Sequence, residues 1–270
     1  DLDINYTKPK YFFNGDVYKN RCYDGYGKAD NSVELRFGPN ITDWPSMSAL
    51  TDNVLLKVVS FITDPVTTTD ELIPSGETSS YRSNPLKLAE FALSRKDPAY
   101  VGRAKEVQKA EKARLSGYNP VDVLEELKDI SDTIKSEFKE FDFENTGIGS
   151  TIYAVKPGDG SAREQAASCQ KVLGGWANIA SEYATKRYRS NLINWGMIPF
   201  ILDGTPSFEN GDYIYVPEIK KAIENKKKEI PSYIIKKGKV ISFMLKMGDI
   251  TDDEKKIILD GCLINFYSEK

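Results

Sequence analysis

Short runs of β-branched and aromatic residues alternate with helix signals through the second half of the chain, and this alternation restricts the fold more than any other feature. The runs predict strands at residues 150–156, 197–202, 212–216, 232–237 and 239–245. Helix signals fill three other stretches: a glycine turn entering a helix over 158–174, a helix over 177–196, and a closing helix over 251–270. The sequence therefore predicts a mixed α/β domain with a compact sheet flanked by helices.

The first half of the chain divides into an arm and the start of the folded domain. Residues 1–50 are rich in Asn, Asp, Gly and Tyr, and turn signals interrupt every periodic run. We interpret them as an extended N-terminal arm or linker, and residues 51–270 as the domain. A buried strand is expected at residues 55–62, followed by a loop over 64–77.

Two helices are expected between that loop and the second half. They cover residues 83–97 and 119–141, because Asn84 and Asn119 are potential N-caps that each precede a proline. Apolar residues recur every three or four positions in the second of them, which indicates one buried face.

Charge and hydropathy limit the partners and the compartment. The 270 residues carry a net charge of −3 with both signs interspersed, which gives no electrostatic reason to expect nucleic acid or an anionic membrane. No long apolar run or signal-peptide pattern is present, so we expect a soluble, cytoplasmic protein. The chain begins with Asp1 rather than Met, which suggests excision from a longer polypeptide, although a chosen expression boundary would give the same start.

The histidine and cysteine content excludes several chemistries. The sequence contains no histidine, so serine–histidine triads and histidine-ligated zinc are impossible within it. Its three cysteines, Cys22, Cys169 and Cys262, form no C-x-x-C pair and cannot build an iron–sulfur cage alone. We expect ordinary thiols in a reducing compartment.

The segment GDGSAREQAA, residues 158–167, has the pattern of an anion-binding turn. Its glycines allow a tight turn with bare N–H groups, and the helix that follows directs its positive end at that turn. Ser161 would lie where those groups stabilise an alkoxide, and Arg163 could bind a carboxylate. The plain alternative is an N-cap serine followed by a solvated Arg–Glu pair.

Two further segments carry polar groups suited to a site. Residues 66–76 hold three threonines, Asp70 and a Pro–Ser–Gly turn, which also suits an ordinary hydrogen-bonded loop. Arg82 precedes the helix expected at 83–97 and can reach back over that loop, although a plain surface arginine would look the same.

Together the segments resemble, in order and kind, the C-terminal swivelling domain of the aconitase superfamily, which includes aconitases, homoaconitases and isopropylmalate isomerases. TTDELIP at 68–74 resembles the family's D-T-D-x-I-I-P signature, GDGSAREQAA its G-x-G-S-S-R-E-x-A loop, and NLINWGMIPF at 191–200 its N-L-x-x-x-G-x-x-P-L segment. The resemblance covers roughly residues 50–270 and implies the swivelling-domain fold, with a longer helical insertion at about 98–145.

The resemblance also implies roles for matching residues. Ser161 takes the position of the family's serine base, which removes a proton from the carbon beside a carboxylate. Four residues match substrate-binding positions: Arg163 is the neighbouring arginine, Thr69 and Asp70 are the pair at the site edge, and Arg82 is the candidate for binding the distal carboxylate. Ser75 is a further substrate-binding candidate.

Two positions depart from the family pattern. Ala162 stands where aconitases have a second serine, and Gln165 where many have histidine. Loss of that serine hydroxyl removes one hydrogen bond to substrate, so citrate itself is in doubt.

The resemblance implies a hydro-lyase or isomerase acting on a small hydroxy di- or tricarboxylic acid. In the family the Lewis acid is a 4Fe-4S cluster, which other domains would supply here, on the same polypeptide or on a partner subunit. We therefore expect the isolated chain to be inactive and to bind no cluster. The alternatives are a non-catalytic interaction or regulatory domain, which Ala162 favours, and a phosphate-binding module, which the absence of a P-loop lysine disfavours.

Overall fold

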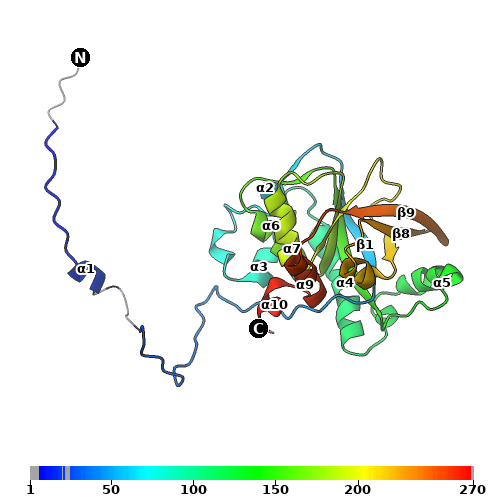
Figure 1. Cartoon of the computed structure of the whole chain (residues 1–270), viewed down its shortest axis with the longest axis horizontal. Coiled ribbons are helices and arrows are strands. Elements are labelled where there is room, and N and C mark those ends of the chain that lie inside the picture. The colour runs from blue at the N-terminus through cyan, green and yellow to red at the C-terminus, as the bar shows by residue number, and fades with distance from the viewer. Residues whose placement is uncertain (1–5, 20, 22–24, 269–270) are drawn as a thin grey trace, which may run out of the picture. The chain divides into compact units, whose positions relative to one another are not determined.

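The structure is a computed structural model that describes residues 6–19, 21 and 25–268 (Figure 1). Internal contacts divide the chain into two units, Asp1–Gly38 and Pro39–Lys270. The first unit has one short helix among its described residues, α1 (Asp16–Lys19), which buries no side chain. The arm at 1–50 and the domain at 51–270 remain our proposed division.

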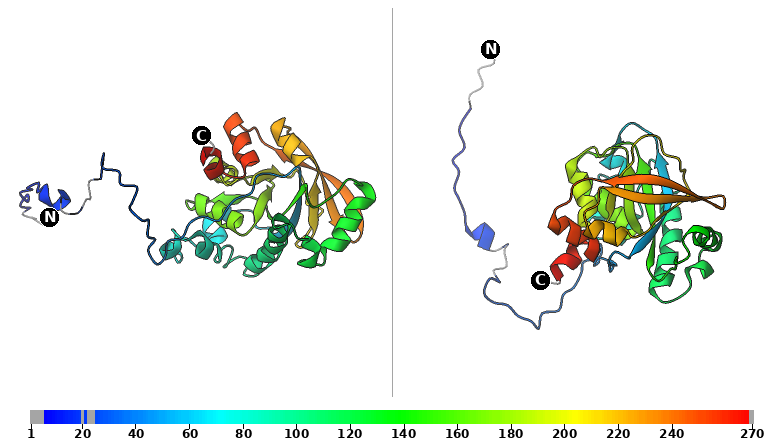
Figure 2. Two further views of the ribbon diagram at one scale, coloured as in Figure 1. Left: turned by 90° about the horizontal axis from the view of Figure 1, so that it is seen from below. Right: turned by 45° about the vertical axis from the view of Figure 1, so that its right-hand side comes forward.

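A seven-stranded sheet closes into a barrel in the second unit (Figures 1 and 2). Around the barrel the order is β1 (Asn53–Ile62), β3 (Thr146–Ala154), β5 (Gly175–Ala180), β6 (Ile198–Ile201), β9 (Lys239–Met247), β8 (Glu229–Lys236) and β7 (Tyr213–Val216). The first four strands are parallel, the other neighbouring pairs are antiparallel, and β7 pairs with β1 to close the ring. The predicted mixed sheet with helices is confirmed, whereas its closure was not predicted.

Helices cover the outside of this barrel. They are α3 (Pro85–Ala89), α4 (Tyr100–Leu115), α5 (Leu127–Glu137), α6 (Arg163–Val172), α7 (Lys186–Asn194), α8 (Ile219–Glu224), α9 (Asp252–Asp260) and α10 (Leu263–Ser268), with short 3-10 turns at Ser79–Tyr81 and Pro120–Asp122. Helix α4 packs on β3 and β1, and α6 packs on both α3 and α7. Within the described part of the chain, no helix is both long and apolar enough to cross a membrane.

Alternating residues of the strands supply two hydrophobic clusters. In β1, Leu55 and Val59 belong to the cluster that includes side chains of α3, α4 and α6. Val54, Leu56 and Val58 belong to the other cluster, with residues of β5, β6 and β7. Because successive strand residues point to opposite faces, the two clusters lie on opposite faces of β1, and each also takes in side chains of the surrounding helices.

The helix expected at residues 177–196 is wrong in its first nine residues. Gly175–Ala180 is strand β5, which lies between β3 and β6, and the helix α7 begins only at Lys186. All six residues of β5 are buried, so the strand has no exposed face. It therefore lacks the alternation of polar and apolar residues that marks a half-buried strand. A fully buried parallel strand cannot be distinguished from a buried helix by periodicity alone.

Other element boundaries also differ from the sequence prediction. The loop expected at 64–77 contains strand β2 (Thr67–Thr68) and helix α2 (Thr69–Leu72). The helix expected from Asn119 starts as a 3-10 turn, and α5 begins at Leu127. The closing helix is broken at Gly261, whose φ of 94° ends α9.

The sequence pattern predicted no individual helix at residues 100–115, where α4 forms. Its buried face consists of Tyr100, Ala104, Val107, Ala110 and Glu111. Because two of these residues are alanines and one is a glutamate, the buried face differs little in hydrophobicity from the exposed face. The sequence therefore shows only a weak helical periodicity of apolar residues.

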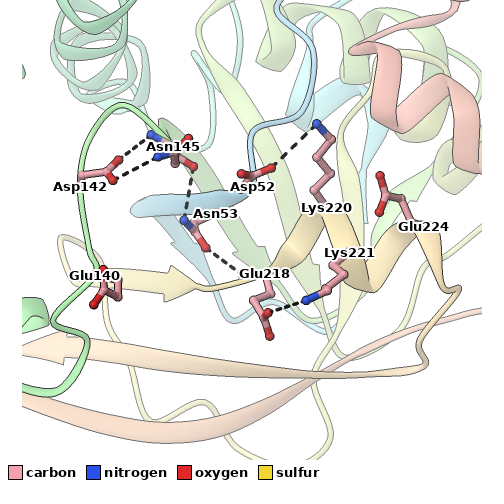
Figure 3. A pocket seen from close by; sticks show the side chains of 9 residues that line it. All are labelled: Asp52, Asn53, Glu140, Asp142, Asn145, Glu218, Lys220, Lys221 and Glu224. Carbon is pink, nitrogen blue, oxygen red and sulfur yellow. Dashed lines mark hydrogen bonds and ion pairs between the residues drawn. The ribbon is translucent and has the colours of Figure 1, made fainter.

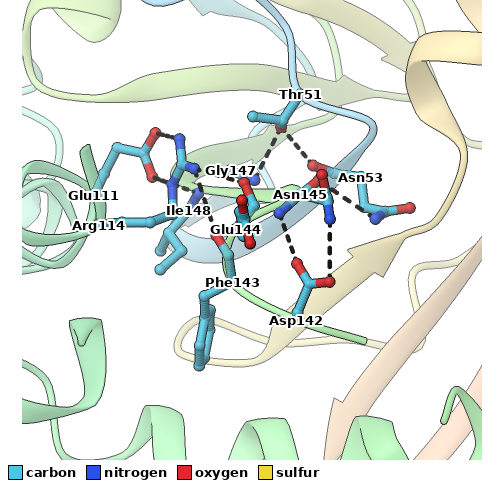
Figure 4. A network of polar contacts seen from close by, with 10 residues as sticks. All are labelled: Thr51, Asn53, Glu111, Arg114, Asp142, Phe143, Glu144, Asn145, Gly147 and Ile148. Atoms are coloured by element: carbon cyan, nitrogen blue, oxygen red, sulfur yellow. Dashed lines mark hydrogen bonds and ion pairs between the residues drawn. The ribbon is translucent and has the colours of Figure 1, made fainter. Parts of the chain in front are cut away.

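A buried ion pair attaches α4 to the barrel (Figure 4). Arg114 donates through Nε and Nη2 to the two carboxylate oxygens of Glu111, at 2.7 and 2.8 Å. The same carboxylate accepts the backbone N–H of Ile148 on β3 at 2.8 Å, and the side chains of the pair are only 10% and 8% exposed. The pair is therefore shielded from solvent, unlike an ordinary surface salt bridge.

Arg114→Met should lower the free energy of unfolding by about 3 kcal/mol, because it leaves the Glu111 carboxylate buried without its cation. Urea denaturation would measure this loss. Lys221→Met is the matched control, since it breaks an exposed pair with Glu218 and should cost under about 0.5 kcal/mol. Glu111→Gln in the Arg114→Met background should recover part of the loss; equal costs for Arg114→Met and Lys221→Met would contradict this account.

Candidate active site

A two-stranded sheet brings the first two sequence motifs together. Strand β2 (Thr67–Thr68) pairs in parallel with β4 (Pro157–Asp159), with Thr68 opposite Asp159. The chain leaves β2 directly into helix α2 and leaves β4 through Gly160 and Ser161 into α6. The segments at 66–76 and 158–167 therefore lie side by side although about ninety residues separate them.

Two glycines make this close pairing possible. Gly158 and Gly160 have φ values of 97° and 129°, which disfavour any residue with a Cβ. A Cβ on Gly160 would lie 2.2 Å from Thr69 Oγ1, and one on Gly158 would lie 2.3 Å from Cδ1 of Tyr188. The turn is thus fixed from two sides, by α2 and by α7.

Ser161 is exposed and precedes α6 rather than capping it. Ala162 is the N-cap residue and offers no side-chain hydrogen bond, so the alternative of an N-cap serine is wrong. The Ser161 hydroxyl has no hydrogen-bond partner among the described residues. The first N–H groups of a helix lack intrahelical acceptors and carry partial positive charge, so the start of α6 is a suitable environment for an anion.

Ser161 lines an open pocket of about 350 Å³ together with Ser75 and Arg82. Residues of the α6 start, Ala162, Glu164 and Gln165, complete its wall. Three of the six predicted site residues therefore meet in one pocket.

Arg82 is held loosely at this pocket. Its Nη2 donates to the backbone oxygen of Ser75 at 3.5 Å, a long contact, and the guanidinium has no ion pair with any residue in the described ranges. Arg82 is exposed, so most of its donors remain available to a ligand carboxylate.

Thr69 and Asp70 lie near this pocket but are not among its lining residues. Thr69 is buried, with its hydroxyl against Gly160. Asp70 accepts from Arg95 at 2.7 Å, and the same arginine donates to Glu77 at 2.5 Å. Asp70 is therefore engaged in an ion-pair network with Arg95.

Arg163 is also outside the pocket wall and has an unmet donor. Its side chain is half-buried, and its buried Nε has no acceptor in the part of the chain that the structure describes. The alternative of a solvated Arg–Glu pair is not found, because Arg163 is half-buried and forms no ion pair with Glu164, whose carboxylate accepts from Trp195 instead. An unmet buried donor is costly, so Arg163 is poised to donate to a ligand or to a neighbouring chain segment.

Glu164 and Trp195 were not identified from the sequence as site residues. The indole Nε1 of Trp195 donates to Glu164 Oε1 at 3.0 Å, which joins the third motif, at 191–200, to the start of α6. Trp195 also lies against Trp44, with ring centroids 4.3 Å apart. Glu164 belongs to the S-A-R-E stretch, but no local pattern showed which way it points.

A larger pocket of about 520 Å³ lies elsewhere in the fold and contains none of the predicted site residues (Figure 3). Both of its lysines are already in ion pairs: Lys221 pairs with Glu218 at 3.1 Å, and Lys220 lies 3.8 Å from Asp52. The smaller pocket at Ser161 is therefore the better candidate.

The described residues do not fit an iron–sulfur cluster. No three Cys, Asp or Glu side chains among them gather as a metal site. Cys169 and Cys262 are buried free thiols, and burial together with the charge of Glu164 raises the pKa of Cys169. A buried protonated thiol is a poor ligand. Cys22 lies outside the described residues.

The chain is similar to known proteins in sequence and in structure. Residues 124–204 match the family model described as the aconitase C-terminal domain. Aconitate hydratase A of Rickettsia bellii is 31% identical over a stretch covering 54% of this chain but only 17% of that protein's own length. The crystal structure of 3-isopropylmalate dehydratase from Methanocaldococcus jannaschii aligns with 80% of this chain and 94% of that one, at 20% identity and a TM-score of 0.47.

Gly160→Ala should destabilise the fold by about 2–4 kcal/mol, because backbone strain at positive φ adds to a clash with Thr69. Gly204→Ala is the matched control: its φ is also positive, at 78°, but nothing lies within 4 Å of its added Cβ, so only the strain of about 1 kcal/mol applies. Thr69→Ala should recover part of the Gly160→Ala loss in a double-mutant cycle followed by thermal unfolding. Equal losses at Gly160 and Gly204 would show that β2 and β4 do not need this close contact.

Proposed function

We propose that the chain is the base-bearing, carboxylate-binding domain of an aconitase-like hydro-lyase or isomerase, because residues 124–204 match the family model described as the aconitase C-terminal domain. The substrate proposed is a small hydroxy di- or tricarboxylic acid. The aligned chain spans about a sixth of the aconitate hydratase it matches, so the remaining machinery of such an enzyme would be contributed by other domains.

One observation carries this proposal: the exposed hydroxyl of Ser161 and the unpaired guanidinium of Arg82 line the same pocket at the start of α6. Dehydration of a hydroxy acid requires a base that removes a proton from the carbon beside a carboxylate, and cations that hold the carboxylates. A serine hydroxyl is a weak base in water. The α6 N–H groups and the substrate-binding arginines would stabilise its ionised form.

The other predicted residues take supporting roles in this proposal. Arg163 has a buried donor without an acceptor, which a substrate carboxylate could satisfy after a small movement. Thr69 would position the Gly160 turn, and through it Ser161. Asp70 would orient the loop through its ion pair with Arg95. Ser75 would contribute a hydroxyl to the pocket wall.

The pocket is open, and we propose that a second domain covers it. That domain would lie on the same polypeptide or on a partner subunit and would hold the 4Fe-4S cluster, because the described residues of this chain offer no group of ligands for it. Assembly would exclude water from the pocket and strengthen the electrostatic contacts of Ser161 and Arg82.

Ser161→Ala, tested in the chain assembled with its cluster-bearing domains, should reduce kcat at least roughly a thousandfold while substrate affinity changes by less than about threefold. The reason is that a base acts mainly in the transition state. Formation of the unsaturated acid measures kcat, and calorimetric titration of the substrate under non-turnover conditions measures affinity.

Ser80→Ala is the control for this experiment, because Ser80 is an exposed serine of the neighbouring loop that does not line the pocket. It should leave both quantities unchanged. Turnover of Ser161→Ala within about tenfold of the parent would defeat the assignment and favour a non-catalytic interaction or regulatory domain.

Arg82→Lys should weaken substrate binding by roughly ten- to a hundredfold, because lysine cannot donate two parallel hydrogen bonds to one carboxylate. Circular dichroism and thermal unfolding should be unchanged, since Arg82 is exposed and makes only one long contact. Normal affinity and turnover in this variant would identify Arg82 as an ordinary surface residue.

A further inference from the structure

Lys171, in the last turn of α6, is a largely buried cation that lines a pocket and has no anionic partner within hydrogen-bond distance among the described residues. The residue is 7% exposed. Its Nζ lies 5.3 Å from the centroid of the Trp176 ring, and across the described residues it makes no hydrogen bond or ion pair. Lysines are almost never buried unless paired, because a desolvated ammonium group is costly. The aromatic contact offsets only part of that cost.

The acidic side chain of the pocket lining, Glu111, is already engaged. Glu111 acts on Lys171 electrostatically, but its carboxylate binds Arg114 at 2.7 and 2.8 Å and the N–H of Ile148 at 2.8 Å. The carbonyl oxygens at the end of α6 are also occupied: Gln108 donates to Val172, and the backbone N–H of Gly174 donates to Lys171. The ammonium group of Lys171 therefore has no carboxylate or carbonyl oxygen bound to it among the described residues.

A small pocket lies beside Lys171, bounded by the segment before β1, helix α4 and the start of β5. Its cavity volume is about 100 Å³, and its polar lining consists of Ser46, Ser48, Gln108, Glu111, Lys112 and Lys171, with the Glu111 carboxylate held by Arg114. Trp176 forms one wall, and its ring is fixed closely against Gly149, where a Cβ would lie 2.2 Å from the ring. With about 30 Å³ for each liquid water molecule, the space suits one small ion and excludes a nucleotide.

We propose that this pocket is a binding site for a small oxyanion, held by the ammonium group of Lys171 with Lys112 and the serine hydroxyls around it. The chemistry is that of one tetrahedral oxyanion or one carboxylate group. Binding would give the buried ammonium group its missing charge-assisted hydrogen bonds and would fill the cavity. The inference does not depend on the function proposed for Ser161.

Proton linkage gives the site a distinctive pH dependence. Burial lowers the pKa of Lys171 to about 8, against smaller opposing effects of Cys262 and Glu111. The charged or titratable groups facing it are Glu111 and Lys112 on α4 and Cys262 after α9, and the segment at 46–48 adds none. Because the anion binds the protonated amine, its affinity should fall about tenfold for each pH unit above about 8.

The site is separate from the pocket at Ser161. Arg163 and Lys171 stand at opposite ends of α6, eight residues apart, which corresponds to about 12 Å of helix rise. Arg82→Gln should therefore leave anion binding at Lys171 unchanged. This variant separates the two sites even if both bind anions.

The experiment is titration of the whole chain with sodium sulfate at constant ionic strength, followed by the NMR signal of the Trp176 indole N–H. Sulfate keeps the same charge from pH 7 to 9.5, so the pH dependence reports on the protein. We expect saturation with a Kd on the order of 1 mM at pH 7. Lys171→Met should weaken binding at least roughly tenfold and Lys112→Met by a smaller factor. Lys109→Met, an exposed lysine of the same helix outside the pocket, should have no effect.

Three results would overturn the proposal: no saturable shift at up to about 50 mM sulfate, equal affinity in Lys171→Met, or an affinity independent of pH between 7 and 9.5. The pH series uses the unaltered chain and so remains decisive if Lys171→Met fails to fold. A parallel titration with acetate distinguishes the ligands, because tighter sulfate binding indicates a tetrahedral oxyanion and tighter acetate binding a carboxylate.

Discussion

The pairing of β2 with β4 is the contact on which the candidate site depends. It joins only Thr67–Thr68 to Pro157–Asp159, yet it aligns the starts of α2 and α6 at one edge of the fold. So short a pairing contributes little by itself. Close packing determines the geometry of this pairing, because Gly160 lies against Thr69 on one side and Gly158 lies against Tyr188 on the other. The position of Ser161 thus depends on side chains that never face the pocket.

Tyr188 connects the Gly158 turn to the buried core of the domain. Its hydroxyl accepts from Gln170 at 2.9 Å and from Asn178 at 2.8 Å, so α6, β5 and α7 meet at one buried phenol. Burial raises the pKa of Tyr188, so the hydroxyl stays neutral. A neutral phenol with two donors is a stable anchor in a dry core. The glycine turn is therefore packed against a side chain that is hydrogen-bonded in the buried core.

The sequence predicted the class of fold and the motifs better than their geometry. Strands with clear β-branched runs, such as β1, were predicted because each run stands between turn signals. Strand β5 was missed because both its faces are buried, and α4 because alanine and Glu111 occupy its inner face. Closure of the barrel depends on the pairing of β7 with β1, across about 160 residues, and no local pattern records such a contact.

The same limit applied to the site. Motif order indicated that Ser161, Ser75 and Arg82 belong together, and the structure brings these three to one pocket. Motif order could not show that Asp70 pairs with Arg95, or that Trp195 binds Glu164, because both contacts join separate segments.

The contact between Trp44 and Trp195 has a spectroscopic consequence. Two indole rings 4.3 Å apart couple their electronic transitions, so the near-ultraviolet circular dichroism of the chain carries a signal from the junction between the segment before β1 and α7.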